Sequence, residues 1–275
     1  MKNLFGSVIY DDAIPFFNTF LESLSRQTMT DFEILLINDG VPVDLLEEML
    51  SGLCLKYKII SYDVHYTPIQ LRIKLLEEAK IRKADILIMG DADDYFSDNR
   101  IDEIVRVFQR EPACGFVYNE LSLFDGSRVM PELPEIIQDV TEIRDYNFLG
   151  LSNTALNLRR LSDNFLESLK ECDTYVFDWY LFSRLLIKGE KGKKVLDAYT
   201  YYRIYDGNVA GIIQMSYESV SKEIAIKLKH YRLLEKYDDI FRGLADAYAR
   251  KNVIYHYKQK SYYWWDLTRE EKHEI

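Results

Sequence analysis

A short apolar run leads directly into three carboxylates in the stretch Ile86-Leu87-Ile88-Met89-Gly90-Asp91-Ala92-Asp93-Asp94-Tyr95-Phe96. An apolar run of this length, bounded by polar residues, is typical of a buried strand in a parallel sheet. We therefore expect a strand over residues 85–90. The carboxylates would follow its carboxyl end, which is the edge where open α/β sheets bind their ligands.

Three carboxylates this close together repel one another unless a cation lies among them. Oxygen ligands suit Mg²⁺ or Mn²⁺ rather than zinc, and Mg²⁺ held by one or two carboxylates completes its shell with water and substrate phosphates. The stretch therefore predicts a site for a divalent ion. The alternative is an acidic loop that caps a helix beginning near Asn99. A calcium loop is excluded, because Phe96 stands where such a loop requires glycine.

The preceding residues repeat the length of a strand–helix–strand unit, with predicted strands that start near residues 5, 32, 57 and 85. Between them, amphipathic stretches that begin at Pro15, Val43 and Ile69 predict helices. This alternation predicts a doubly wound, mostly parallel α/β sheet of Rossmann type with right-handed crossovers. The sequence contains neither G-x-G-x-x-G nor a Walker loop, so the usual dinucleotide and ATP fingerprints are absent.

The rest of the chain has less regular patterns. They predict, in order, a helix over 99–110, a hairpin at Asp125-Gly126, an irregular crossing segment over 131–145, a strand over 151–158, helices over 161–170 and 177–188, and a strand over 195–205. Apolar residues at helical spacing then predict one helix from 214 and a second from 240 to about 260. We therefore expect two domains, an α/β domain over 1–211 and a helical extension over 212–275.

The composition is that of a folded, soluble protein, with 48% hydrophobic and 29% charged residues. A net charge of −10 argues against nucleic acid as a partner, because binding to phosphates needs a basic surface. Three scattered cysteines predict a reducing compartment and no zinc site. No signal-peptide core follows the N-terminus and no apolar run approaches 18 residues, so we expect a cytoplasmic protein.

Taken in order, several short motifs resemble the family 2 glycosyltransferases, which have the GT-A fold. The resemblance covers about residues 4–211. It rests on the acidic end of the first strand, Asn38-Asp39-Gly40, Arg72, Asp91-Ala92-Asp93-Asp94, Asp178 before Arg184-Leu185-Leu186 and Gly189, Tyr202-Arg203-Ile204-Tyr205, and Asn208. The first strand lacks the Pro-Thr-x-Asn ending that is usual in the family, and has Tyr10-Asp11-Asp12-Ala13 instead.

The resemblance implies a donor site at the strand ends. Asp39 would recognise the base or ribose of the nucleotide, helped by Asp11 or Asp12, and Arg72 and Arg203 would bind the donor, with Arg72 on its diphosphate. From the residues alone, Asp39-Gly40 is also consistent with a simple strand-to-helix turn. Arg72 is equally consistent with a solvated helix face.

The resemblance also implies the catalytic groups. Asp91 and Asp93 would form the DXD motif that holds Mn²⁺ or Mg²⁺, with Asp94 as a local cap or a sugar contact. Asp178 would be the general base that deprotonates the acceptor hydroxyl, although a lone Asp near a helix start is often an N-cap. Phe177 stands where many relatives have an acidic residue, and Tyr205 stands where many have a histidine.

The implied function is an inverting, metal-dependent transfer of a sugar from a UDP-, GDP- or dTDP-linked donor to a saccharide or lipid-linked acceptor, in cell-surface polysaccharide synthesis. The alternative is a catalytically degenerate member that binds a sugar nucleotide or a carbohydrate. A phosphatase that uses an Asp-x-Asp pair as nucleophile and acid is disfavoured. In such an enzyme the pair follows an early strand, whereas in this chain it follows the fourth predicted strand. The extension over 212–275 would pack on the domain, form a homodimer, or contact the inner face of the cell membrane through its basic and aromatic residues.

Overall fold

The structure is a computed structural model that describes residues 1–130, 132–205, 213–214, 216–251, 261–262 and 266–268. Its internal contacts divide the chain into two units. Unit 1 comprises Met1–Ile137, Gly150–Glu171 and Glu190–Arg203, and unit 2 comprises Gln138–Leu149, Cys172–Gly189 and Ile204–Ile275. The expected division into functional domains at residue 211 stays a prediction.

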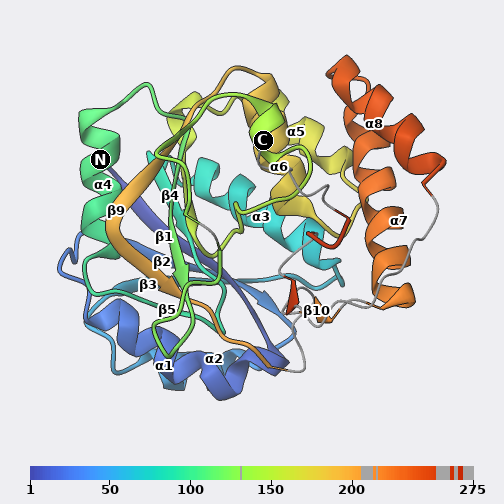
Figure 1. Cartoon of the computed structure of the whole chain (residues 1–275). Coiled ribbons are helices and arrows are strands. Elements are labelled where there is room, and N and C mark those ends of the chain that lie inside the picture. The colour runs from blue at the N-terminus through green and yellow to red at the C-terminus, as the bar shows by residue number, and fades with distance from the viewer. Residues whose placement is uncertain (131, 206–212, 215, 252–260, 263–265, 269–275) are drawn as a thin grey trace. The chain divides into compact units, whose positions relative to one another are not determined.

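One sheet dominates unit 1 (Figure 1). Its strands within the described residues are β1 (Asn3–Tyr10), β2 (Glu33–Asp39), β3 (Lys56–Ser61), β4 (Ile86–Met89), β5 (Tyr95–Phe96), β6 (Phe116–Ser122), β7 (Ile136–Ile137), β8 (Thr154–Asn157) and β9 (Gly192–Tyr201). Neighbouring strands follow the order β3-β2-β1-β4-β8-β6-β9-β5, and β7 pairs with β9.

Most strands of this sheet point the same way. Strands β1 to β4 form parallel pairs, and β6 pairs with β9 in parallel. Strand β8 lies antiparallel between β4 and β6, so those two strands share one direction, whereas β5 and β7 run antiparallel to β9. The mostly parallel α/β sheet expected from the sequence is therefore confirmed, with three antiparallel strands added to it.

Helices cover both faces of this sheet. They are α1 (Ile14–Ser25), α2 (Val43–Leu50), α3 (Pro68–Ile81), α4 (Arg100–Arg110) and α5 (Asp163–Ser168). Successive residues of a strand face opposite sides, and β1 shows what lies on each. Phe5 belongs to a core that includes Phe20 of α1 and Ile104 of α4, whereas a side chain at Gly6 would meet Leu75 of α3. The first strand is therefore buried on both faces, as its apolar sequence predicts.

Two expectations about element boundaries need correction. The predicted hairpin at Asp125-Gly126 is a tight turn, with Gly126 at φ 83°, but it is followed by a single bridge between Ser122 and Arg128 rather than by a second strand. The late strand runs over Gly192–Tyr201 rather than 195–205, and at its first residue the ring of Phe116 lies where a side chain would be. Only glycine permits that close packing against β6.

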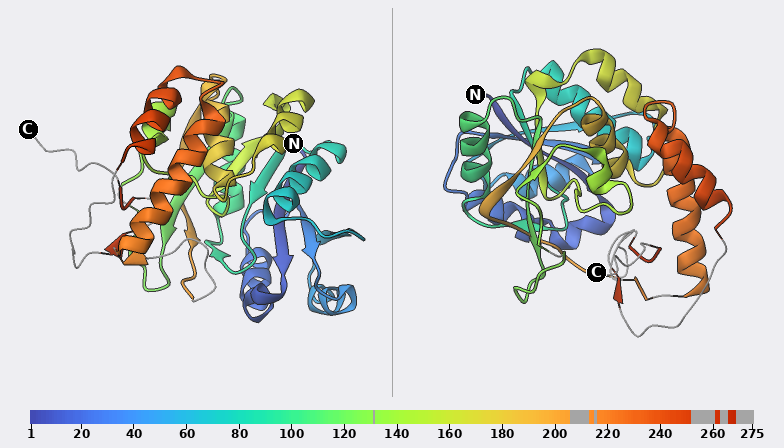
Figure 2. Two further views of the ribbon diagram at one scale, coloured as in Figure 1. Left: turned by 90° about the vertical axis from the view of Figure 1, so that its right-hand side faces the viewer. Right: turned by 45° about the horizontal axis from the view of Figure 1, so that its top comes forward.

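Unit 2 is built from helices. It contains η2 (Val140–Ile143), α6 (Phe177–Ile187), α7 (Tyr217–Leu234) and α8 (Asp239–Ala249), with a short pairing of β10 (Ile213–Gln214) and β11 (Ser261–Tyr262). Figure 2 shows α7 and α8 lying side by side. The two helices expected after residue 214 are thus present, and α8 ends at Ala249. The remainder of the second predicted helix, over 252–260, lies outside the described residues, as does Asn208.

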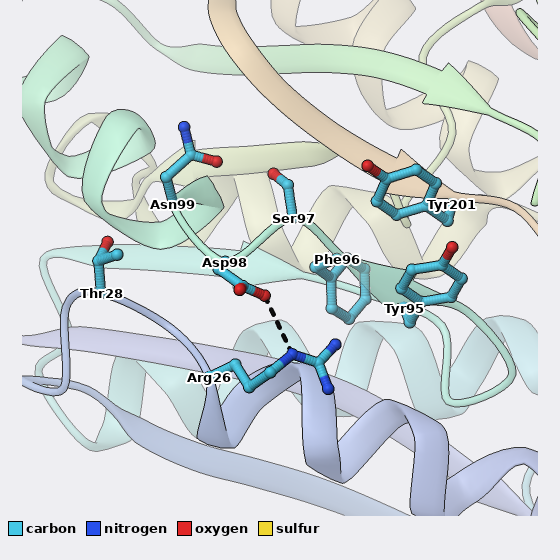
Figure 3. A pocket seen from close by; sticks show the side chains of 8 residues that line it. All are labelled: Arg26, Thr28, Tyr95, Phe96, Ser97, Asp98, Asn99 and Tyr201. Atoms are coloured by element: carbon cyan, nitrogen blue, oxygen red, sulfur yellow. Dashed lines mark hydrogen bonds and ion pairs between the residues drawn. The ribbon is translucent and has the colours of Figure 1, made fainter. Parts of the chain in front are cut away.

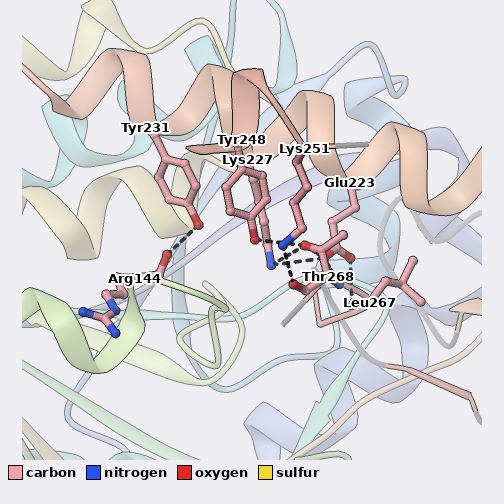
Figure 4. Close-up of polar contacts among 8 residues, drawn as sticks. All are labelled: Arg144, Glu223, Lys227, Tyr231, Tyr248, Lys251, Leu267 and Thr268. Atoms are coloured by element: carbon pink, nitrogen blue, oxygen red, sulfur yellow. Dashed lines mark hydrogen bonds and ion pairs between the residues drawn. The ribbon is translucent and has the colours of Figure 1, made fainter. Parts of the chain in front are cut away.

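Buried polar groups tie the last described residues to α7 and α8 (Figure 4). The Glu223 carboxylate accepts hydrogen bonds from the backbone amides of Leu267 and Thr268 at 3.0 and 2.8 Å. Lys227, one turn along α7, lies 3.1 Å from the same carboxylate and donates to the Thr268 hydroxyl. Each buried charge therefore has a partner, which is the condition under which such charges are tolerated. Among the described residues, no helix is long and apolar enough to cross a membrane.

Candidate functional site

The first two strands end side by side at the predicted ligand-binding edge. Tyr10, the last residue of β1, is the register partner of Asp39 at the end of β2. Strand β4 ends earlier, because Met89 pairs with Gly6. The loop that follows β4 therefore runs beside the last residues of β1, and the Tyr10 hydroxyl donates a 3.2 Å hydrogen bond to Asp93. The topology thus brings the DXD stretch to the end of β1.

Gly90 makes this approach of the loop possible. A β-carbon at this position would lie 2.4 Å from Cζ of Phe96 and 2.5 Å from Cζ of Phe5. Both rings are buried in the core, so neither can yield without cost. The residue between the strand and the first carboxylate therefore has to be glycine.

The three carboxylates occupy different environments. Asp94 is almost fully buried, with Oδ2 accepting a 2.5 Å hydrogen bond from Ser152 Oγ and Oδ1 accepting one of 2.9 Å from the Arg203 amide. Burial raises the pKa of Asp94 well above its ordinary value, and the charges of Asp93 and Asp91 raise it further. Asp94 is therefore directed into the protein, whereas Asp91 is partly exposed and Asp93 is buried beneath the Tyr10 hydroxyl.

The alternative interpretation of these acids as a helix cap is wrong. Helix α4 has Asn99 at its N-cap, whose side chain makes no capping hydrogen bond, and the Ile101 amide in the first turn donates to Gln27 Oε1. The carboxylate of Asp94 is instead used by Ser152 and Arg203. The acidic loop is therefore not the cap of helix α4.

Arg72 reaches the DXD stretch from α3. Its Nη2 lies 3.9 Å from Oδ1 of Asp91, and both side chains are about one-third exposed. An exposed pair at this distance contributes little to stability. The guanidinium therefore remains able to turn toward an anionic ligand beside Asp91, and the structure does bring these two predicted residues together.

The acidic residues at the ends of β1 and β2 are less enclosed. Asp11 and Asp12 are exposed in η1 (Asp11–Ala13), and Asp39 is half-buried. The buried Asn38 side chain builds the turn after β2, since it accepts from the Val41 amide and donates to the Val41 carbonyl. Asn38 therefore forms the turn, and the carboxylate of Asp39 is not needed for it.

Arg203 contacts the same loop from the end of β9. Its Nε donates a 2.8 Å hydrogen bond to the Asp93 carbonyl. The guanidinium carbon lies 4.3 Å from the ring centre of Phe16 and 4.4 Å from that of Phe124, as in cation–π contacts. Arg203, which is predicted to bind the donor, is thus held between two aromatic rings and against the backbone of the DXD stretch.

The donor set fits a hard divalent ion that is bound together with phosphate. The predicted oxygen ligands are the carboxylates of Asp91, beside Arg72, and of Asp93, which accepts from Tyr10, whereas Asp94 is bound by Ser152 and the Arg203 amide. Within the described residues no group of three or more His, Cys, Asp or Glu side chains could hold a metal ion. Two carboxylates suit Mg²⁺ or Mn²⁺, which completes its shell with water and phosphate oxygens.

Asp178 belongs to unit 2. It lies in the first turn of α6, partly exposed, and its Oδ1 accepts a 2.7 Å hydrogen bond from the Trp179 amide. The N-cap residue is Val176, so Asp178 is not the N-cap of α6, although its carboxylate satisfies one amide of the first turn. Phe177 is buried in unit 2. The position where many relatives carry an acid is therefore a packing position in this chain.

A pocket of about 440 Å³ lies at the β5 edge of the sheet (Figure 3). Tyr95 and Tyr201 stack across the pairing of β5 and β9 with ring centres 4.3 Å apart, and Arg26 pairs with Asp98 at 3.2 Å. None of the residues predicted to bind the donor or the metal, or to act as the base, lines this pocket.

Three residues that the sequence did not single out belong to the site. Tyr10 bonds to Asp93, Ser152 bonds to Asp94, and the buried Arg100 donates to the carbonyl that precedes the motif, that of Met89. Tyr10 could have been found, because it ends a strand beside two acids. Ser152 carries no local signal, since it lies 61 residues beyond Asp91.

Comparison with known proteins gives one family match and many similar folds. Residues 9–165 match the family described as glycosyl transferase family 2, and this match covers more than half of the chain. No curated protein matches the sequence. The structure of residues 1–349 of S. aureus TarS in complex with UDP-GlcNAc is similar, with a TM-score of 0.59 and 13% identity over 86% of this chain and 71% of that chain.

Two further structures are similar at the same level. A mannosyltransferase from Pyrobaculum calidifontis, PcManGT, in complex with GDP-Man and Mn²⁺, has a TM-score of 0.58 and 12% identity over 89% of this chain and 69% of that chain. GalNAc-T7 with UDP, GalNAc and Mn²⁺ has a TM-score of 0.59 and 14% identity over 92% of this chain and 52% of that chain. Likeness at such low identity shows that the fold is shared.

Proposed function

The chain belongs to glycosyl transferase family 2 and is a glycosyltransferase of the GT-A fold, and we propose that it moves a sugar from a nucleoside-diphosphate donor to a saccharide or lipid-linked acceptor, with a divalent ion and with inversion. The observation that carries the proposal is the convergence of Asp39, Arg72, Asp91 and Asp93 at the carboxyl ends of β1, β2 and β4.

The donor would lie along this edge of the sheet. Asp39 would accept hydrogen bonds from the base or ribose, helped by Asp11, and Arg72 would bind the diphosphate through its planar fork of donors. A Mg²⁺ or Mn²⁺ ion held by Asp91 and Asp93 would offset the charge that grows on the departing diphosphate. Arg203 would add positive charge beside the same phosphates, because its guanidinium already lies against the motif. Relatives of similar fold bind UDP-GlcNAc and GDP-Man, so UDP, GDP and dTDP donors are the ones to test.

Asp178 would act as the general base of the transfer. It would take the proton of the acceptor hydroxyl as that oxygen forms a bond to the anomeric carbon. The bond between the anomeric carbon and the diphosphate oxygen would break on the opposite face, and its electrons would leave with the nucleoside diphosphate. A base of this kind has to come within about 3 Å of the hydroxyl in the complex with substrate.

The variant Asp178→Asn tests this assignment. It should lower kcat by about a thousandfold, in line with the contribution of general base catalysis, while the affinity for donor stays unchanged. Asp239→Asn is a matched control, because Asp239 is likewise an acid in the first turn of a helix of unit 2. Normal turnover by Asp178→Asn would remove Asp178 from the mechanism. If donor binds but neither wild type nor control transfers sugar to any acceptor tried, the chain would be a sugar-nucleotide-binding protein.

We also propose that the exposed face of α7 contacts an anionic membrane at the cytoplasmic side, where lipid-linked acceptors lie. Lys222, Ala225, Lys229 and Arg232 recur at intervals of three and four along α7 and are exposed, and Lys236 lies exposed just beyond the helix. This stripe is basic in a chain of net charge −10. Lys229 is paired with Asp173, whereas apolar side chains between the cations line a hollow of about 400 Å³. Clustered cations beside apolar surface suit anionic headgroups.

A further inference from the structure

A closed ring of hydrogen bonds surrounds the DXD stretch. The Asp91 amide donates to Ser152 Oγ at 3.1 Å, and the same hydroxyl donates to Asp94 Oδ2 at 2.5 Å. The other Asp94 oxygen accepts from the Arg203 amide, whose side-chain Nε donates back to the Asp93 carbonyl. The ring thus begins and ends on the two residues predicted to hold the metal.

Ser152 is itself fixed by buried groups. Its carbonyl accepts from Arg100 Nη2 and from the Thr200 hydroxyl, both at 2.9 Å. The same Arg100 nitrogen donates to the Met89 carbonyl at 2.8 Å, and Arg100 Nε donates to Asn119 Oδ1. One fully buried guanidinium therefore joins Met89, the last residue of β4, to Ser152.

Arg100 also packs within the core. It is fully buried, and its guanidinium carbon lies 4.6 Å from the ring centre of Phe96, as in cation–π contacts. The carboxyl group of Asp94, which accepts hydrogen bonds from Ser152 and from the Arg203 amide, is likewise directed into the protein.

We propose that Ser152 and Asp94 are positioning residues that hold the carboxylates of Asp91 and Asp93 in the arrangement that binds the metal–diphosphate group. This inference rests on the proposed function. The Ser152 hydroxyl fixes the amide of Asp91 and passes that constraint to Asp94. Asp94 in turn fixes Arg203, which holds the carbonyl of Asp93. Both residues predicted to hold the metal are therefore fixed through their backbone.

The experiment measures the affinity of Mn²⁺ in the presence of UDP, or of GDP where only GDP binds, for the full chain. Ser152→Ala should weaken Mn²⁺ binding about tenfold, as loss of a group that orients metal ligands does. Ser7→Ala is the control, because the Ser7 hydroxyl is buried in β1 and has no hydrogen-bond partner among the residues that the structure describes. Ser152→Thr, which keeps the hydroxyl, should bind Mn²⁺ more tightly than Ser152→Ala.

A double-mutant cycle separates positioning from general destabilisation. Asp94→Asn keeps the shape of the side chain but removes one acceptor oxygen. If the two residues act through one hydrogen bond, Ser152→Ala should weaken Mn²⁺ binding little further in the Asp94→Asn background. Additive losses, or a Ser152→Ala variant that binds as tightly as wild type, would overturn the inference alone. A wild-type chain that binds no Mn²⁺ with either nucleotide would overturn the proposed function and this inference together.

Discussion

The hydroxyl of Tyr10 donates a 3.2 Å hydrogen bond to Oδ2 of Asp93, although 83 residues separate the two in the chain. The bond joins the end of β1 to the loop after β4 and restrains one of the two carboxylates proposed to hold the metal. A hydrogen bond to a charged group contributes about 1.5–3 kcal/mol. The tyrosine therefore restrains the orientation of this carboxylate.

Tyr10→Phe should weaken Mn²⁺ binding in the presence of a nucleoside diphosphate by about tenfold, because it removes this hydrogen bond and keeps the ring. Calorimetric titration gives the affinity. Tyr57→Phe on the exposed surface of β3 is the matched control and should bind as wild type does. Equal affinities in all three proteins would show that Tyr10 does not orient Asp93.

Glycine at position 90 is required by packing. Gly90→Ala should lower the free energy of unfolding by about 1–3 kcal/mol, because its methyl group would overlap the rings of Phe5 and Phe96. Gly243→Ala, in α8 and with open space around the added carbon, should instead stabilise the protein by about 0.5–1 kcal/mol. Urea unfolding measures both. If both substitutions changed the free energy of unfolding in the same direction, the packing seen around Gly90 would be contradicted.

His230 predicts how stability depends on pH. The ring is fully buried and stacked on Trp179 at 4.3 Å, and neither nitrogen has a hydrogen-bond partner among the described residues. Burial, with a smaller contribution from the charge of Lys227, lowers the pKa of His230 from 6.5 to about 3. Between these values the unfolded chain binds a proton that the folded chain does not, so stability falls as pH decreases below 6.5.

The expected slope is at most about 1.4 kcal/mol per pH unit over this range. His230→Phe keeps a ring against Trp179 and removes the titration, so its urea unfolding should vary less between pH 6.5 and 5 than that of wild type. His65→Phe, at an exposed position, should retain the wild-type slope. If wild type and His230→Phe lose stability in parallel, another group is responsible.

The basic face of α7 predicts binding to anionic vesicles. The full chain should sediment with vesicles that contain phosphatidylglycerol and not with phosphatidylcholine alone, and added salt should release it. Lys222→Glu combined with Arg232→Glu should weaken this binding about tenfold or more, since each cation contributes about 1 kcal/mol. Lys56→Glu combined with Lys58→Glu, an equal charge change on β3, should not. Equal loss in both pairs would indicate a response to net charge rather than a membrane surface.

The sequence predicted the parts of the site that follow strands. The strand before Asp91, the turn after Asn38 and the helix that carries Arg72 have local periodicity, and parallel strands bring their ends together whatever the details. The groups that hold the motif could not be predicted in this way. Ser152 contacts Asp91 across 61 residues, and Arg100 is a basic residue that only tertiary packing makes buried.

The sequence analysis also missed structural features that depend on contacts between residues far apart in the chain. Strand β5 is two residues long and forms because Tyr95 and Phe96 pair with β9. No local sequence pattern predicts this pairing. The grouping of 138–149 and 172–189 with the C-terminal helices depends on contacts such as the hydrogen bond from the Tyr231 hydroxyl to the Arg144 carbonyl. Sequence periodicity carries no information about such distant partners.

The most direct test of the account is a thermal unfolding series with UDP, GDP, dTDP and CDP, each with and without Mn²⁺. A nucleotide present at 100 times its dissociation constant should add about 2.7 kcal/mol of stability. The account predicts that at least one nucleotide stabilises wild type and Asp98→Ala only when Mn²⁺ is present, and that Asp91→Ala shows no such effect. Stabilisation that survives in Asp91→Ala, or no response to any nucleotide, would contradict it.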